Sequence, residues 1–150
     1  MEISADMVKV LREETGVSVM QCKKALEEAG GDMDKAREAL KVIAAAQAEK
    51  KADRTLGGGV VASYIHSNKK MGVLLELVCE TDFVAQNEEF ISTATQIAMH
   101  TGAMDPENVE ALLEQPFLMN PEMTIQQVIE GLVQKTGERV EISKFVRYSI

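Results

Sequence analysis

Apolar residues in the first third of the chain recur every three or four positions, which is the spacing of an amphipathic helix. Gly16 ends the first such stretch, and the pair Gly30 and Gly31 ends the second. Ser18 followed by Gln21 forms a capping-box pattern at the start of the second stretch. We therefore predict three short helices, the third of which continues as a solvated connecting helix to about residue 51.

The pattern changes after residues 57–59, which are three consecutive glycines that interrupt the helical stretch. Residues 60–66 are rich in β-branched and aromatic side chains, and residues 72–79 are strongly apolar, so both segments are predicted to be strands. The second of these strands is apolar on both alternating faces. Helices on one side of a sheet cannot cover all of it.

Helices and one more strand are predicted in the remainder of the chain. One helix is expected over about residues 87–101, and a short one is expected to begin at Pro106, because proline suits the first helical position. Thr124 with Gln127 forms a second capping box for a helix to about residue 135. The last strand alternates, and these of its residues are predicted to share one face: Val140, Ile142, Val146, Tyr148 and Ile150.

Together these elements predict an α+β protein with two domains. Residues 1–56 are expected to form a three-helix module with its connecting helix. Residues 57–150 are expected to form a two-layer domain, most simply a three-stranded antiparallel sheet with helices on one face.

Charge is distributed unevenly along the chain, whose net charge is −8. Residues 71–134 contain 11 acidic residues and no Lys or Arg. Because phosphate backbones are bound by clustered basic side chains, this stretch would repel nucleic acid, and no nucleic-acid partner is expected.

The sequence favours a cytoplasmic location. The apolar runs are too short to span a membrane, so no membrane partner is expected, and the first residues lack the pattern of a signal peptide. Cys22 and Cys79 are too few for a disulfide framework and are expected to be reduced thiols.

Candidate catalytic chemistry is sparse. Cys79 with His66 or His100 would be needed for a thiol nucleophile and its base, but Cys79 ends an apolar strand and fits a buried small residue better. Two Cys and two His residues at scattered positions show no metal-ligand spacing. The glycines at 57–59 are not followed by the Lys-Ser or Lys-Thr of a phosphate-binding loop. We therefore expect no enzyme activity, no cofactor and no metal.

The polar connection at residues 79–87 contains two large apolar side chains, Phe83 and Val84. They could fold back onto the core or protrude as anchors for a partner. The residue pattern by itself favours the core for both.

The chain resembles the elongation factor Ts family, the exchange factors of elongation factor Tu. The matching segments, in order, are KVLREETG at 9–16, MQCKKAL at 20–26, GDMDKA at 31–36, KKA at 50–52, SYIH at 63–66, GVLLE at 72–76, CETDFVA at 79–85, IAMH at 97–100, QPFLM at 115–119, GERV at 137–140 and FVRY at 145–148. Each segment is weak alone, but their joint order over the whole chain is specific. The resemblance implies that the three-helix module is similar to a ubiquitin-associated domain.

The resemblance also implies a function and a set of residues. The protein would bind elongation factor Tu in its GDP-bound form, disturb its magnesium site and promote GDP release. The residues implied in magnesium dislocation are Thr81, Asp82, Phe83 and Val84. Those implied in binding the partner are Arg12, Val19, Met20 and His66.

Two departures from the family pattern affect these expectations. Many members have two core subdomains, whereas this chain has room for one, and it lacks a long helical segment expected before residues 115–116. A homodimer that pairs through the exposed part of the sheet would supply a second core.

Another class of function also fits part of the sequence. A three-helix module of this kind could be an adaptor for ubiquitin-like proteins or other peptides, with residues 15–17 in the binding turn. Val17 is not aromatic, however, and such a function would not explain residues 81–84.

Overall fold

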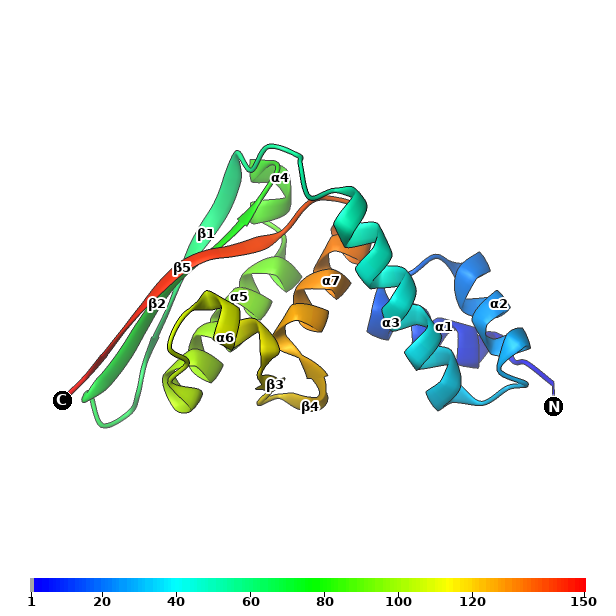
Figure 1. Ribbon diagram of the computed structural model, residues 1–150, viewed down its shortest axis with the longest axis horizontal. Helices are drawn as coiled ribbons and strands as arrows, with labels where there is room; N and C mark the ends of the chain where they lie inside the picture. Colours follow the sequence, from blue (N-terminus) through cyan, green and yellow to red (C-terminus); the bar gives the residue numbers. More distant parts are fainter. Residues whose placement is uncertain (1) are drawn as a thin grey trace. The chain divides into compact units, whose positions relative to one another are not determined.

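Figure 1 shows a computed structural model that describes residues 2–150. The chain divides into two compact units. One consists of residues 2–53 with Glu130–Gly137, and the other of Arg54–Ile129 with Glu138–Ile150. The boundary predicted at residues 56–57 stays a prediction.

The first unit contains the three predicted helices, α1 (Ala5–Thr15), α2 (Val19–Glu28) and α3 (Met33–Lys50). Each begins at a residue whose side chain accepts a backbone N–H of the first turn, namely Ser4, Ser18 and Asp32. The helix starts are therefore encoded locally, and the prediction of three helices is confirmed.

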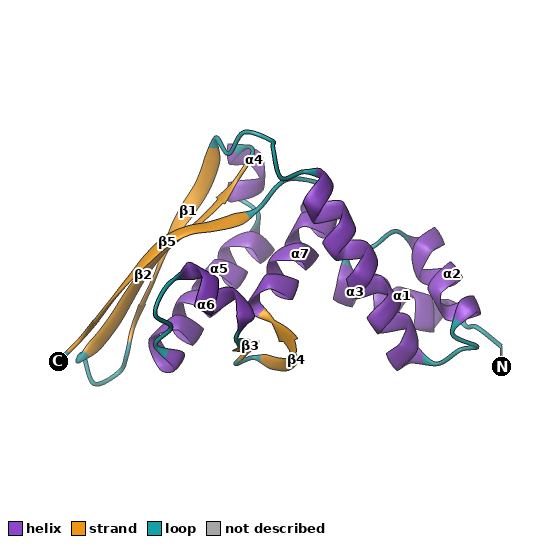
Figure 2. Cartoon of the chain, in the orientation of Figure 1, coloured by secondary structure: helices purple, strands orange, loops and turns teal. Residues whose placement is uncertain are grey.

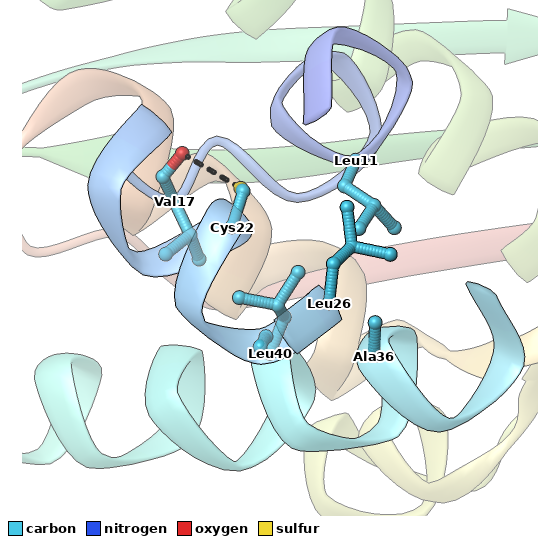
Figure 3. Packing of buried hydrophobic residues seen from close by; sticks show 7 residues of the cluster. Leu11, Val17, Cys22, Leu26, Ala36 and Leu40 are labelled. Carbon is cyan, nitrogen blue, oxygen red and sulfur yellow. Dashed lines mark hydrogen bonds between the residues drawn. The ribbon is translucent and has the colours of Figure 1, made fainter. Parts of the chain in front are cut away.

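The three helices bury one apolar cluster, shown in Figure 3. Cys22 lies inside this cluster, and its thiol donates a hydrogen bond to the Val17 carbonyl at 3.4 Å. Val17 itself is fully buried. The remaining members of the cluster are Leu11, Ala25, Leu26, Ala36 and Leu40.

The second unit is built on an antiparallel sheet of β1 (Gly58–Ile65), β2 (Met71–Cys79) and β5 (Glu141–Ser149), in the order β1-β2-β5. Its strands are orange in Figure 2. The helices α4 (Asp82–Ala85) and α5 (Glu88–Met104) pack against β1 and β2. The predicted α+β class and three-stranded antiparallel sheet are confirmed.

The chain continues from α5 through α6 (Val109–Glu114), the short hairpin of β3 (Pro116–Phe117) and β4 (Asn120–Thr124), and α7 (Ile125–Thr136). The predicted capping box is present: the Gln127 N–H donates to the Thr124 hydroxyl at 3.2 Å, and the Thr124 N–H donates to the Gln127 side chain at 3.0 Å. The short helix predicted after α5 is present, but its predicted start at Pro106 was wrong. Asp105 instead ends α5 in the left-handed conformation, and α6 begins four residues later at Val109, capped by Asn108.

The sheet has one apolar face that none of the helices of its own unit covers completely. The inward side chains of β2 are buried, whereas Leu74, which points to the other face, is 51 % exposed. Other exposed apolar residues on these strands are Val61, Ile65, Val146 and Tyr148. The prediction that β2 is apolar on both faces is confirmed.

The prediction that residues 140–150 keep one apolar face was wrong. Glu76 lies opposite Lys144 but Leu77 lies opposite Ile142, so one extra residue, Ser143, interrupts the register of β5. Such a bulge reverses which face the following side chains occupy. Ile142 is consequently buried, whereas the later apolar residues of β5 are exposed.

Candidate functional site

The feature of the second unit that stands out is the four-residue helix α4, which follows β2 directly. Thr81 is its N-cap, and its hydroxyl accepts the Val84 N–H at 3.3 Å. Asp82 occupies the first turn, where a negative charge favours the helix N-terminus. The sequence therefore encodes a tight turn at the predicted site residues 81–84.

Phe83 and Val84 have opposite environments in this turn. The Val84 side chain is 6 % exposed and belongs to the core, as expected from the residue pattern. The Phe83 side chain is 87 % exposed, so the expectation that it folds back onto the core was wrong. A four-residue helix presents successive side chains about 100° apart, and only one of the two can face the sheet.

Glu138, which lies 57 positions further along the chain than Thr81, holds the start of this turn. One carboxylate oxygen accepts the N–H groups of Glu80 at 3.1 Å and Thr81 at 3.0 Å. The other oxygen accepts the Thr81 hydroxyl at 2.7 Å. Hydrogen bonds to a carboxylate are roughly twice as strong as neutral ones, so Glu138 fixes this backbone firmly.

Two further contacts support the turn. The Glu80 carboxylate accepts the Arg139 N–H at 2.7 Å and pairs with Arg54 at 3.4 Å. On the other side, Gly58 lies directly against the turn, because a Cβ added there would be 2.6 Å from the carbonyl carbon and oxygen of Thr81. The glycine run at 57–59 thus allows a close approach of two backbone segments, and Gly58 already belongs to β1.

The predicted partner-binding residues Arg12, Val19 and Met20 belong to the first unit, on α1 and α2. Arg12 and Val19 line a groove of about 450 Å³ between these helices, together with Ile3, Ser4, Ala5, Val8, Lys9 and Lys23. The Met20 side chain is 81 % exposed. The lining is mostly apolar with three basic side chains, two of which, Lys9 and Lys23, pair with Glu13 and Glu27 on their own helices.

His66, the fourth predicted partner-binding residue, lies in the second unit just after β1. It is exposed, and its Nδ1 atom lies 3.0 Å from the Tyr64 hydroxyl.

The thiol-enzyme alternative finds no support in the geometry of Cys79. Its side chain is fully buried and donates to the Thr81 carbonyl at 3.2 Å. Burial, and secondarily the nearby Glu138 carboxylate, raise the pKa of the Cys79 thiol, which disfavours the reactive thiolate. Cys79 is a packed residue beneath α4.

His100 is also a buried structural residue. Its Nδ1 accepts the Leu118 N–H at 3.0 Å, so the neutral ring carries its proton on Nε2 and donates to the Gln115 side chain at 2.9 Å. Burial lowers the pKa of His100, although the bond to Gln115 opposes this shift. The ring therefore fastens the end of α6 and the β3–β4 hairpin to α5.

Within residues 2–150, no three His, Cys, Asp or Glu side chains are grouped so that they could hold a metal ion. No helix in the same described range has the length and apolar character needed to cross a membrane.

Two sets of residues at the turn and the groove were not predicted from the sequence. Glu138 belongs to a segment that carried the family resemblance, but no local signal connected it with residues 80–81. Lys9 and Lys23 line the groove beside Arg12, and their positions on the predicted helices, three residues before Arg12 and four after Val19, are a signal that could have identified them.

Comparison with known proteins gives consistent similarities. A family model described as elongation factor TS matches residues 80–150. The chain is 42 % identical to elongation factor Ts of Desulforamulus reducens, over 99 % of this chain and 89 % of that protein. It is 38 % identical to elongation factor Ts of Thermosipho melanesiensis (99 % and 98 %) and 40 % identical to that of Fervidobacterium nodosum (100 % and 99 %).

These relatives are longer than this chain. The alignment with the Desulforamulus reducens protein runs over 194 positions against 150 residues here, so at least 44 positions of that relative have no counterpart in this chain. A shortened sequence agrees with the expectation that a segment is missing. Its predicted place before residues 115–116 stays a prediction.

Proposed function

This chain belongs to the elongation factor Ts family, and we propose on that basis that it is a guanine nucleotide exchange factor for elongation factor Tu. It binds the GDP-bound GTPase and promotes GDP release so that GTP can bind. The observation that carries this proposal is Phe83, a large apolar side chain that is 87 % exposed on a turn fixed by several hydrogen bonds.

The exposed turn acts as a wedge on the magnesium site of the GTPase. Mg²⁺ requires nearly ideal octahedral geometry, and GTPase switch segments are ordered through that ion and the phosphates. Phe83, inserted between elements of the GTPase, displaces the ligands of the ion, while Thr81 and Val84 keep the turn rigid and Asp82 adds a negative charge at its exposed side. Once Mg²⁺ is lost, GDP is held less tightly.

The first unit supplies a separate binding surface for the GTPase. Arg12, Val19 and Met20 contact the nucleotide-binding domain of the GTPase, and Lys9 and Lys23 add positive charge at the edge of the groove. His66 contributes a contact from the second unit. Binding through both units raises the effective concentration of the Phe83 turn at the GTPase, and this favours insertion of Phe83.

No covalent bond changes in this mechanism. The protein lowers the affinity of its partner for nucleotide, and it is therefore not an enzyme in the chemical sense. We propose further that it works in the cytoplasm without a nucleic-acid partner, and that its first domain, residues 1–56, is of the ubiquitin-associated type.

Reciprocity provides a test of this proposal. If the chain weakens GDP binding by a given factor, GDP must weaken binding of the chain to the GTPase by the same factor. Titration of the chain into nucleotide-free elongation factor Tu, with and without excess GDP, measures both affinities. We expect a loss of at least about tenfold with GDP, within the usual range of coupling energies. Equal affinities with and without GDP would exclude an exchange function.

We also propose that the working species is a homodimer, paired through the exposed face of the β1-β2-β5 sheet. Tyr148 is 73 % exposed and Leu74 51 %, and both lie on this face. The Glu76–Lys144 pair, with 3.5 Å between its charged atoms, neutralises the charges on the same face, so that a second copy meets few unpaired charges there. The apolar face and the single core of a shortened chain support the proposal.

Sedimentation equilibrium tests the dimer. A dimer has twice the 16.4 kDa of one chain, and Leu74→Lys is expected to shift the mass toward the monomer because it introduces a charge at the centre of the face. Lys24→Glu, on the exposed surface of α2, is the control and should leave the mass unchanged. A mass that stays near 16.4 kDa at tens of micromolar would exclude the dimer.

A further inference from the structure

The hydrogen bonds around Thr81 connect it to a residue far along the chain. The short helix α4 is capped by its own Thr81, as is usual, but the connection before it is held by a distant side chain. Here the N–H groups of Glu80 and Thr81, and the Thr81 hydroxyl, all donate to the carboxylate of Glu138, which comes just before β5. One side chain thus satisfies three donors of the strand-to-helix connection.

We propose that Glu138 is a positioning residue for exchange: its carboxylate fixes the backbone at residues 80–81, and this sets the direction in which Phe83 projects. The inference rests on the proposed function, in which Phe83 is the group that enters the GTPase. Glu138 itself need not touch the partner.

The geometry supports action through Phe83. Thr81 connects the two residues, because its hydroxyl donates to Glu138 and accepts the Val84 N–H of the first turn of α4. The exposed Phe83 ring makes few contacts that would orient it, so its direction depends on the backbone that carries it. Gly58 also lies close to this backbone, since a Cβ added there would be 2.6 Å from the carbonyl group of Thr81.

Whether the turn is already ordered before binding also affects how readily Phe83 is inserted into the GTPase. A segment that must be ordered on binding spends part of its interaction free energy on that ordering, whereas a fixed segment does not. In the proposed function the first unit also binds the GTPase, so the ordering cost falls on insertion of Phe83. Loss of Glu138 should therefore lower the maximum rate of GDP release more than the affinity of the chain for its partner.

The side chain at position 138 can be changed in two informative ways. Glu138→Gln keeps the length, so its carbonyl oxygen can still accept both N–H groups and its amide can donate to the Thr81 hydroxyl. Glu138→Asp keeps the charge but is one methylene too short to reach the same donors. If the placement of the side-chain oxygen atoms matters, Glu138→Gln should be better tolerated than Glu138→Asp. If only the negative charge matters, the reverse is expected.

The experiment compares wild type, these two variants and Glu138→Ala in release of labelled GDP from elongation factor Tu at saturating protein. Glu141→Ala is the matched control, because that carboxylate binds the Arg139 guanidinium at 2.6 Å. We expect about a tenfold or greater loss of maximum rate for Ala and Asp, a loss of about threefold or less for Gln, and little change for Glu141→Ala.

A double-mutant cycle separates positioning from loss of stability. If Glu138 acts through Phe83, adding Glu138→Ala to Phe83→Ala should slow release by no more than about twofold further. Fully multiplicative effects of the two substitutions would overturn the inference. Should Glu138→Ala fail to fold, the same cycle is made with Glu138→Asp.

Amide hydrogen exchange of the free protein gives a readout that does not depend on the GTPase. The amides of residues 80 and 81 should exchange at least about tenfold faster in Glu138→Ala than in Glu141→Ala. Equal protection of these two amides in the two variants would overturn the inference. It would also be overturned if the wild type accelerates GDP release and Glu138→Ala does so equally well. A wild type that does not accelerate GDP release would overturn the proposed function as well.

Discussion

Phe83 and Val84 are consecutive residues of α4, yet Phe83 projects into solvent while Val84 is buried against the core. Burial of Val84 anchors the short helix to the sheet domain, and this anchoring holds the neighbouring phenyl ring outward. An exposed Phe normally has no stabilising role, since apolar side chains contribute to stability when they leave water. The arrangement therefore fits a residue that is kept for contact with a partner.

Phe83→Ala should separate stability from activity. Because the ring is exposed, we expect the free energy of unfolding to change by no more than about 0.5 kcal/mol, while GDP release becomes much slower. Phe90→Ala is the control: Phe90 is fully buried on α5, and its truncation should cost about 3–5 kcal/mol. Urea denaturation and release of labelled GDP measure the two quantities. A drop in stability for Phe83→Ala as large as that for Phe90→Ala would show that Phe83 is a core residue.

Gly58→Ala should displace the turn from its other side. The added methyl group would lie 2.6 Å from backbone atoms of Thr81, which cannot rotate away as a side chain would. We expect a loss of about 1–3 kcal/mol in stability, typical of overpacking, together with slower GDP release. Gly131→Ala, inside α7 with nothing within 4 Å of the added atom, should instead stabilise the protein by about 0.5–1 kcal/mol. If both substitutions are stabilising, the close approach at Gly58 is absent in solution.

His100 should make stability depend on pH. Burial lowers its pKa in the folded protein, whereas the unfolded chain takes up the proton near the ordinary value of 6.5. Between these two values the unfolded state binds more protons, so the stabilising contribution is complete above about pH 6.5 and decreases as the pH falls toward the folded value. Urea denaturation between pH 7.5 and 5.5 measures this slope. It should be smaller in His100→Gln than in the wild type, and identical slopes in the two proteins would contradict the buried neutral ring.

Met20→Ala should weaken binding to elongation factor Tu without affecting the fold. Met20 is exposed on α2, and an apolar side chain at the centre of an interface contributes more than about 1 kcal/mol, or roughly fivefold in affinity. Arg12→Ala should act in the same direction. The control is Val42→Ala on α3, another exposed apolar residue of the same unit that does not line the groove. Titration of each variant into the nucleotide-free GTPase measures the effect, and equal losses for positions 20 and 42 would refute the assignment of this surface.

Features that depend on neighbours in sequence could be predicted from the sequence. The capping box at Thr124 forms as expected, because cap and partner are three residues apart. At Ser18 the hydroxyl accepts the Gln21 N–H as predicted, but the Gln21 side chain accepts from the Ser18 hydroxyl instead of its N–H. The three strands of the larger sheet were also predicted from their apolar pattern, whereas their order β1-β2-β5 and the short β3–β4 hairpin were not. The family resemblance drew attention to residues 81–84, and the role it implies for them stays a prediction.

Features that depend on distant contacts could not be predicted in this way. The extra residue Ser143 reverses the faces of β5, and nothing in its local sequence marks the bulge. The orientation of Phe83 depends on which of two adjacent apolar side chains reaches the sheet. Glu138 reaches Thr81 across 57 positions, and such contacts leave no trace in local periodicity.

The central claim is that the chain speeds nucleotide release from elongation factor Tu, and the most direct measurement is the rate of labelled GDP release as a function of chain concentration. The account predicts a rate that rises with concentration to a plateau far above the spontaneous rate, with no hydrolysis of nucleotide by the chain alone. A release rate that stays at the spontaneous value when the chain is at saturating concentration would contradict it.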